Sequence, residues 1–269
     1  MKKTRKLIQK LLKIFSMFLI TIIVMFLTFV INGTIEYGKV SKQIDDFKSR
    51  GVYVTTIDDH VFYEVESMYD YEDTSKKIYS YELYKTNHNY VGTYGDIMIT
   101  SRNPMTGTSV EWIVGMFSKY FYVGHATINS HVDGKYMYES EGKNQKRVRE
   151  TMNNWMYLKN SPTIIGLRVK TDMETITHAL EYCEEQIGKP YNSTFLFNRA
   201  NSFYCTDLVS RSFYNSGINI NYDYLATTGN DMILSPNTYM IFYQETVYEG
   251  IKAWYHVYNL KDKVGENNE

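Results

Sequence analysis

The order of apolar and polar positions divides the chain into an apolar N-terminal segment, a polar stretch and a longer region of mixed pattern. Residues 14–31 form an uncharged apolar run, and six lysines and arginines precede it. At about 1.5 Å rise per residue, a helix over this run reaches about 27 Å, close to the roughly 30 Å core of a bilayer. We therefore predict a single transmembrane anchor over residues 14–31.

The charges beside this run predict its orientation. Basic flanks stay on the cytoplasmic side, so residues 1–13 are expected inside and the remainder outside the cell membrane. A cleaved signal peptide is the alternative, since residues 31–34 (Ile-Asn-Gly-Thr) offer a weak cleavage site. Both interpretations give the rest of the chain an extracytoplasmic location.

Beyond the apolar run, the pattern predicts three further regions. Residues 32–89 are polar, charged and rich in tyrosine, and we interpret them as a juxtamembrane spacer or an N-terminal embellishment. Ile44 and Phe47 indicate a short helix there, and the later alternation of tyrosine and glutamate indicates strands. The pattern changes at Tyr90, and residues 90–258 are predicted to form one α+β domain. The charged residues 259–269 are predicted to fray.

Alternation of apolar and polar positions predicts the strands of this domain. The predicted strands cover residues 95–99, 122–128, 136–139 and 164–169. In the second strand the small apolar residues share one face and His125 lies on the other. The dipeptide Asp133-Gly134 predicts the hairpin turn that joins the second strand to the third.

Apolar spacing of three to four residues predicts two helices. The first covers residues 171–187, and Cys183 lies on its apolar stripe. The second begins near Cys205, with Asn201 and Ser202 as candidate capping residues.

Composition and charge exclude several classes of function. The net charge is −1, which offers no bulk attraction to nucleic acid. The spacing of histidines and cysteines provides no zinc ligand set, and the chain has no glycine-rich phosphate loop. We therefore expect no metal, no cofactor and no nucleic-acid partner. The two cysteines are too few for a disulfide scaffold, so each requires its own interpretation.

The two cysteines occupy different positions in the predicted helices. Cys205 falls in a first turn, where the helix N-terminus favours the thiolate and therefore a nucleophile. Cys183 falls on an apolar stripe and is assigned to the core. Among the six histidines, His125 has the most ordered context, on a strand beside small residues, and is the candidate base.

A catalytic imidazole needs a third polar group to orient it. Glu139 and Glu141 follow the hairpin turn, and the strand register decides which of them can reach His125. A two-residue loop pairs His125 with Gly142 and turns both glutamates to the other face. A three-residue loop that ends on a left-handed Gly134 pairs His125 with Glu141 and leaves Glu139 as a diagonal neighbour on the same face.

Five short blocks resemble the motifs of NlpC-type papain-like hydrolases. The blocks are residues 95–99 (Gly-Asp-Ile-Met-Ile), 123–128 (Val-Gly-His-Ala-Thr-Ile), 136–139 (Tyr-Met-Tyr-Glu), 187–191 (Ile-Gly-Lys-Pro-Tyr) and 203–209 (Phe-Tyr-Cys-Thr-Asp-Leu-Val). In ordinary members of that family the cysteine block precedes the histidine block. Here the order is reversed, which resembles the circularly permuted branch, the YiiX/YebB-like and lecithin-retinol-acyltransferase-like proteins.

The resemblance covers about residues 90–237 and implies a permuted papain-like NlpC fold. In that fold an antiparallel sheet packs on the helix that carries the nucleophile, here preceded by the N-terminal transmembrane helix. The implied site residues are the nucleophile Cys205, the base His125, the orienting residue Glu139, and Tyr191 and Tyr204 in the substrate or oxyanion region.

The expected function is that of an extracytoplasmic cysteine hydrolase that acts through a thioester acyl-enzyme on amide bonds of cell-wall peptides. A lipid acyl hydrolase or acyltransferase is one alternative. The permuted branch includes acyl-transferring relatives, and residues 112–117 are apolar enough to allow it, within a segment 101–120 that we expect to form a lid or a lipid-facing helix. A catalytically inactive binding module is the other. The expected partners are a cell-wall peptide or an acyl lipid, together with the membrane.

Overall fold

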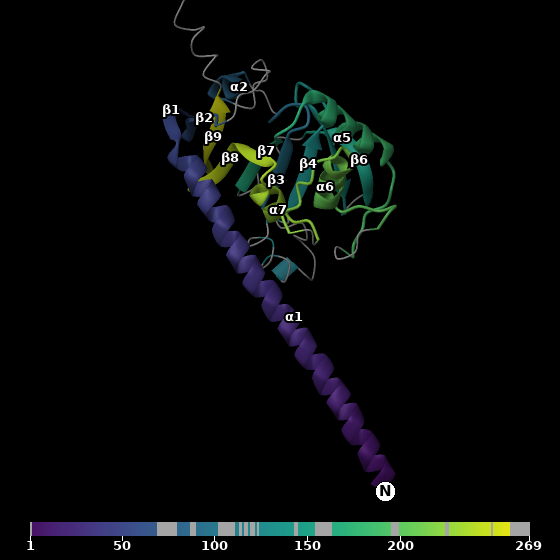
Figure 1. Ribbon diagram of the computed structural model, residues 1–269. Helices are drawn as coiled ribbons and strands as arrows, with labels where there is room; N and C mark the ends of the chain where they lie inside the picture. Colours follow the sequence, from purple (N-terminus) through teal and green to yellow (C-terminus); the bar gives the residue numbers. More distant parts are fainter. Residues whose placement is uncertain are drawn as a thin grey trace, which may run out of the picture.

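One long helix joins the apolar N-terminal run to the core of the protein. In the computed structural model, α1 (Lys2–Ser49) is continuous, and its N-terminal half projects away from the other elements (Figure 1). In its C-terminal part, Val40, Ile44 and Phe47 are buried on one stripe with helical spacing. The predicted short helix near Ile44 is therefore the end of α1.

The described part of the chain contains one helix that is long and apolar enough to cross a membrane, and that helix is α1. The structure describes residues 2–68, 80–86, 90–101, 111–112, 115, 118, 122, 124–142, 145–153, 163–194, 199–223, 226–248 and 250–258. Most of the segment predicted as a lid, residues 101–120, lies outside the described residues. The predicted frayed tail, residues 259–269, also lies outside them.

Within the described residues, nine strands form one sheet in the order β1-β2-β9-β8-β7-β3-β4-β5-β6. The strands are β1 (Gly51–Ile57), β2 (His60–Glu66), β3 (Ile97–Thr100), β4 (His125–Asn129), β5 (Tyr136–Glu141), β6 (Arg147–Met152), β7 (Thr163–Val169), β8 (Thr238–Tyr248) and β9 (Ile251–Tyr258). The four strands predicted from the sequence correspond to β3, β4, β5 and β7.

The sheet differs from the prediction at its β1–β2 end. β2 pairs with β9 in parallel, so the sheet is not antiparallel throughout. Most of the chain separates these two strands, so no short hairpin turn joins them. A hairpin turn would force the strands to run antiparallel, and without one they can pair in parallel. Both β1 and β2 fall in residues 32–89, the stretch interpreted as a juxtamembrane spacer or an N-terminal embellishment with strands in its Tyr/Glu alternation. In the structure, residues 51–57 and 60–66 form two strands of the main sheet. β2 joins the sheet because its apolar side chains are buried against β9. Phe62 of β2 packs on Trp254 of β9, with ring centroids 4.6 Å apart.

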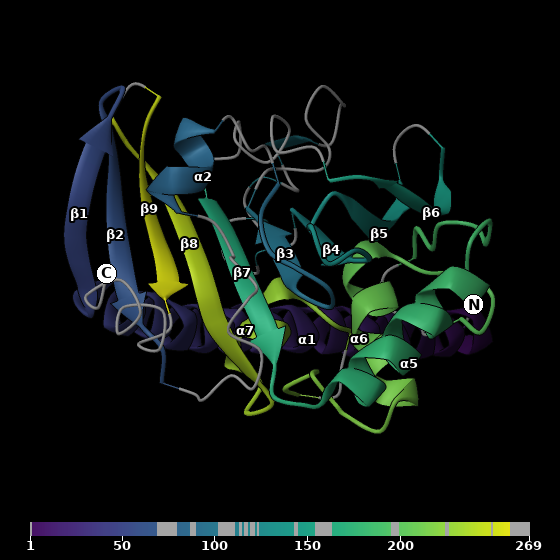
Figure 2. The ribbon, with the colours of Figure 1, turned by 90° about the horizontal axis from the view of Figure 1, so that it is seen from above.

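Besides α1, the described residues include the helices α2 (Tyr81–Lys85), α5 (Met173–Glu185), α6 (Cys205–Asn215) and α7 (Gly229–Leu234). Two of these, α5 and α6, cover the end of the sheet that carries the candidate site. α5 and α6 lie side by side, and α6 packs on β4 and β5 (Figure 2). α7 packs between α1 and β8.

Candidate active site

The first turn of α6 places Cys205 against the sheet. Leu208, Val209 and Phe213 are buried on the side of α6 that faces the core, which holds the helix in place. Tyr204 is the residue that caps the N-terminus, in an extended conformation and without a side-chain capping bond. The predicted caps, Asn201 and Ser202, are therefore wrong: the chain is still extended at Tyr204 and turns into the helix only at Cys205.

The sulfur of Cys205 lies where backbone donors converge. The backbone N–H groups of Thr206, in α6 itself, and of Ala126, in β4, act on the sulfur and lower the pKa of the thiol. Ser140 of β5 donates to the carbonyl of Phe203 over 2.7 Å, which ties the segment before α6 to the same pair of strands. The thiol is thus held at a helix N-terminus and beside β4.

The β4–β5 hairpin brings a histidine and a glutamate together. Ile128 pairs with Tyr138 and Asn129 with Met137, and Gly134 is left-handed, with φ of 68°. This is the register of the predicted three-residue loop. Nε2 of His125 lies 2.6 Å from Oε2 of Glu139, the diagonal neighbour.

Glu141, the other candidate, is engaged elsewhere. Its Oε2 accepts the backbone N–H of Gln145 over 2.8 Å, in the turn that leads from β5 to β6. Strict cross-strand geometry would have favoured Glu141 for His125. The structure instead assigns the contact with the imidazole to Glu139.

Arg149 is a member of the site that the sequence analysis missed. It lies on β6 directly opposite Glu139, and its Nε and Nη2 donate to Oε1 of Glu139 over 2.8 and 2.6 Å. One carboxylate oxygen therefore faces the arginine and the other faces the histidine. The alternation Arg147-Val148-Arg149 was the available signal, because it indicates a strand with two arginines on one face.

The charges of these groups favour an ion pair between the cysteine and the histidine. Burial disfavours the protonated imidazole, but the neighbouring Cys205 and Glu139 outweigh it and hold the pKa of His125 well above its usual value. Burial likewise disfavours the thiolate, but His125 and the two backbone donors hold the pKa of Cys205 below its usual value. Despite burial, His125 and then Arg149 lower the pKa of Glu139.

The ring nitrogens of His125 have separate partners. Nε2 is occupied by Glu139, and the ring also hydrogen-bonds the thiol of Cys205, which leaves Nδ1 for the sulfur. A thiolate beside a protonated imidazole, with the proton on the nitrogen that faces the sulfur, is an arrangement suited to nucleophilic attack and proton delivery.

Tyr191 and Tyr204, both predicted in this region, have different surroundings. Burial, followed by the charge of Cys205, raises the pKa of Tyr191, so its hydroxyl stays protonated near the sulfur. Its ring lies over Gly142, where a Cβ atom would come within 2.7 Å of it. Tyr204 is buried, and its hydroxyl interacts with Thr227.

Cys183 and Asp96 of the Gly95-Asp96 block have structural roles. Cys183 is fully buried in the hydrophobic core, which confirms that assignment, and burial raises the pKa of its thiol to about 12. Asp96 is buried and accepts both Nε and Nη2 of Arg168, over 2.6 and 2.7 Å. This ion pair joins the start of β3 to β7 and does not involve the cysteine or the histidine.

Comparison with known proteins places this arrangement in a family. A family model described as "Permuted papain-like amidase enzyme, YaeF/YiiX, C92 family" matches residues 94–254, more than half of the chain. Among solved structures, the crystal structure of metalloprotein yiiX from Escherichia coli O157:H7 is similar, with 14% identity and a TM-score of 0.43, over 55% of this chain and 96% of that one. No curated protein sequence matches the chain significantly.

Proposed function

Because the chain belongs to the permuted papain-like amidase family, we propose that it is a cysteine amidase with Cys205 as nucleophile, His125 as acid and base, and Glu139 as orienting carboxylate. The observation that carries this proposal is the 2.6 Å contact between His125 and Glu139, in which the same ring bonds a cysteine at the N-terminus of α6. Arg149 acts through Glu139 as a positioning residue.

In the proposed first step, the thiolate of Cys205 attacks the carbonyl carbon of an amide. The new C–S bond forms as the carbonyl π electrons move to oxygen, giving a tetrahedral oxyanion. The backbone N–H of Cys205 is among the first of α6 and has no partner within the helix, so it is suited to bind that oxyanion, and the nearby hydroxyl of Tyr191 is a second donor. Protonated His125 then gives its Nδ1 proton to the departing nitrogen, the C–N bond breaks, and a thioester remains.

The second step returns the enzyme to its starting state. Neutral His125 takes a proton from a water molecule as the water oxygen adds to the thioester carbonyl. Collapse of the second tetrahedral intermediate breaks the C–S bond, releasing the carboxylic acid and the thiolate. Glu139 supports both steps because a carboxylate on Nε2 stabilises the protonated ring and keeps the exchangeable proton on the side of the sulfur.

For the substrate, we propose an amide bond in a cell-wall peptide, met on the extracytoplasmic side of the membrane. The apolar half of α1 and the basic residues before it support an anchored protein with the site outside. Lipid amides or esters are the alternative substrates, because an anchored enzyme also meets lipid, and the same thiolate would attack their carbonyl groups.

Activity-based labelling of the purified full chain tests the chemistry. Iodoacetamide should label Cys205 and stop amide hydrolysis, while Cys183→Ala keeps the activity and Cys205→Ala abolishes it. An active Cys205→Ala variant would refute the nucleophile. Hydrolysis of purified peptidoglycan compared with acyl lipids decides between the two substrate classes.

Protease added to intact spheroplasts tests the location. We expect digestion of the region after residue 49 without lysis. Protection until lysis would place this region inside the cell and would exclude the cell wall as substrate.

A further inference from the structure

Three carboxylates meet where α1 contacts the segment around α7. Glu36 comes from α1, Asp231 from α7, and Asp223 from the chain before α7, and one oxygen from each lies within 4.8 Å of the others. Glu36 and Asp231 are 5% and 2% exposed, and Asp223 is half-buried. This acidic cluster is separate from the cysteine site.

Asp231 caps α7 with only one of its two carboxylate oxygens. Its Oδ2 accepts the backbone N–H and the hydroxyl of Thr228 over 2.7 and 2.8 Å, which completes the capping box of α7. Its Oδ1 is buried and has no hydrogen-bond donor among the described residues. A buried carboxylate oxygen without a donor costs free energy unless a positive charge faces it.

The hydrogen bonds that reach Glu36 among the described residues come from neutral amides. Nδ2 of Asn32 donates to Oε1 of Glu36 over 2.5 Å, and Asn230 bonds the same side chain. Neither amide supplies a positive charge.

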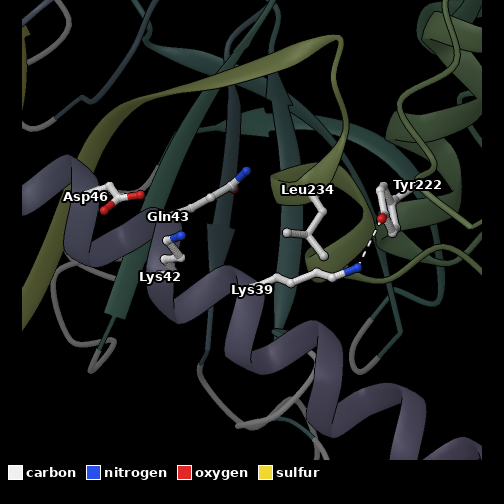
Figure 3. Close-up of a pocket in the computed structure, with 6 residues that line it drawn as sticks. All are labelled: Lys39, Lys42, Gln43, Asp46, Tyr222 and Leu234. Atoms are coloured by element: carbon white, nitrogen blue, oxygen red, sulfur yellow. Dashed lines mark hydrogen bonds between the residues drawn. The ribbon is translucent and has the colours of Figure 1, made fainter.

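Lys39 lies on the same helix as Glu36, but its ammonium group is engaged elsewhere. Figure 3 shows a pocket between α1 and the segment that carries Tyr222 and Leu234, where the Lys39 ammonium donates to the hydroxyl of Tyr222 over 3.2 Å. Lys39 is therefore not the counter-charge for the buried oxygen of Asp231.

We propose that Glu36, Asp223 and Asp231 bind a divalent cation that prefers oxygen ligands, with Ca²⁺ as the best fit. Oxygens bound to one Ca²⁺ at about 2.4 Å can lie up to about 4.8 Å apart, and one oxygen from each of the three carboxylates lies within 4.8 Å of the others. The set contains no histidine or cysteine, which disfavours zinc.

Such a site would join two parts of the molecule. Glu36 lies before the region matched by the family model, residues 94–254, whereas Asp223 and Asp231 lie inside it. The cation would therefore fasten α1 to the family domain. It would also steady the segment that reaches the cysteine helix, because the hydroxyl of Thr206 in α6 donates to the carbonyl of Thr227 over 2.6 Å.

The test uses the purified full chain in detergent, stripped with EDTA and titrated with CaCl₂ by calorimetry. We expect one saturable site. At ten times the dissociation constant, Ca²⁺ should raise the unfolding temperature by about 3–6 °C, while NaCl of equal ionic strength should not. Asp223→Asn should abolish both effects, and Glu36→Gln gives a second, independent removal of a ligand should the first variant fold poorly.

Asp45→Asn is the matched control, because Asp45 is exposed on the same helix outside the cluster. It should bind Ca²⁺ as the wild type does. Absence of saturable binding of Ca²⁺ and Mg²⁺ to the wild type would overturn the proposal. Unchanged binding in both Asp223→Asn and Glu36→Gln would also overturn it. Stabilisation by mild acid alone, without a response to either cation, would mean that a shared proton satisfies the cluster and would overturn it as well.

Discussion

Replacing Glu139 by glutamine should disrupt the proposed triad, because Arg149 determines which end of the new amide faces His125. In the wild type, Oε1 accepts both N–H groups of Arg149 and Oε2 faces Nε2 of His125. A glutamine offers one oxygen and one NH₂ group. Because a guanidinium can only donate, it should retain the oxygen and turn the NH₂ group toward His125.

The altered amide should place the ring proton on the wrong nitrogen. Nε2 must then accept a hydrogen bond, which puts the proton of the neutral ring on Nδ1. That nitrogen can no longer take the proton of Cys205, so the thiolate–imidazolium pair is lost. Loss of a charge-assisted hydrogen bond costs about 1.5–3 kcal/mol, or about 10- to 150-fold in rate. A wrong tautomer in the serine-protease triad costs about 10⁴-fold, so we expect acylation to slow by about 10²- to 10⁴-fold.

The assay is the single-turnover rate of acylation, measured across pH for matched variants. Glu141→Gln is the control, since it makes the same chemical change two residues away on the same strand, and its rate should stay near that of the wild type. Adding Arg149→Leu to Glu139→Gln frees the amide to rotate and present its oxygen to His125. The double variant should therefore be faster than the Glu139→Gln variant.

Two results would refute this reasoning. If Glu141→Gln is the crippled variant, the orienting carboxylate has been misassigned. If the double variant is no faster than Glu139→Gln alone, Arg149 does not select the orientation of the amide. A wild-type rate in Glu139→Gln would instead reduce the site to a dyad of Cys205 and His125.

Three further predictions concern other parts of the molecule. Iodoacetamide labelling of Cys205 should persist at neutral pH and weaken as the pH falls through the lowered pKa of the thiol; Cys183, with a pKa near 12, should stay unlabelled in the native protein. Gly142→Ala should push the ring of Tyr191 aside and lower kcat/KM with little change in unfolding temperature, and an unchanged kcat/KM would remove Tyr191 from the site. Asp96→Asn breaks a buried ion pair and should cost about 3–5 kcal/mol in denaturant unfolding; a loss below 1 kcal/mol would contradict that role.

The contact between His125 and Glu139 was within reach of the sequence, because a hairpin register is local. One left-handed glycine, Gly134, selects the three-residue register and thereby sets which residues share a face. Arg149 was harder to place. Its partner depends on the register of β5 against β6, and the sequence between these strands, residues 142–146, carries no signal for a single loop length.

Pairings between distant segments were not predictable in the same way. β2 and β9 lie side by side although most of the chain separates them, and nothing local to either strand specifies the other. The extension of α1 was obscured for another reason. Its buried stripe contains Glu36 as well as Val40, Ile44 and Phe47, and a buried acid interrupts the apolar pattern by which a core-facing helix is identified.

Because α1 is continuous, the number of residues between its apolar half and its buried half sets how the folded domain is rotated and how far it stands from the apolar half. Each residue turns the helix by about 100° and advances it by about 1.5 Å. Inserting one residue between Ile31 and Glu36 would swing the folded domain about a quarter-turn around the helix axis. Inserting seven would restore its facing direction to within about 20° and raise it by about 10 Å. A one-residue insertion therefore changes mainly the direction in which the domain faces, and a seven-residue insertion changes mainly its distance from the apolar half. Neither insertion alters a residue of the site.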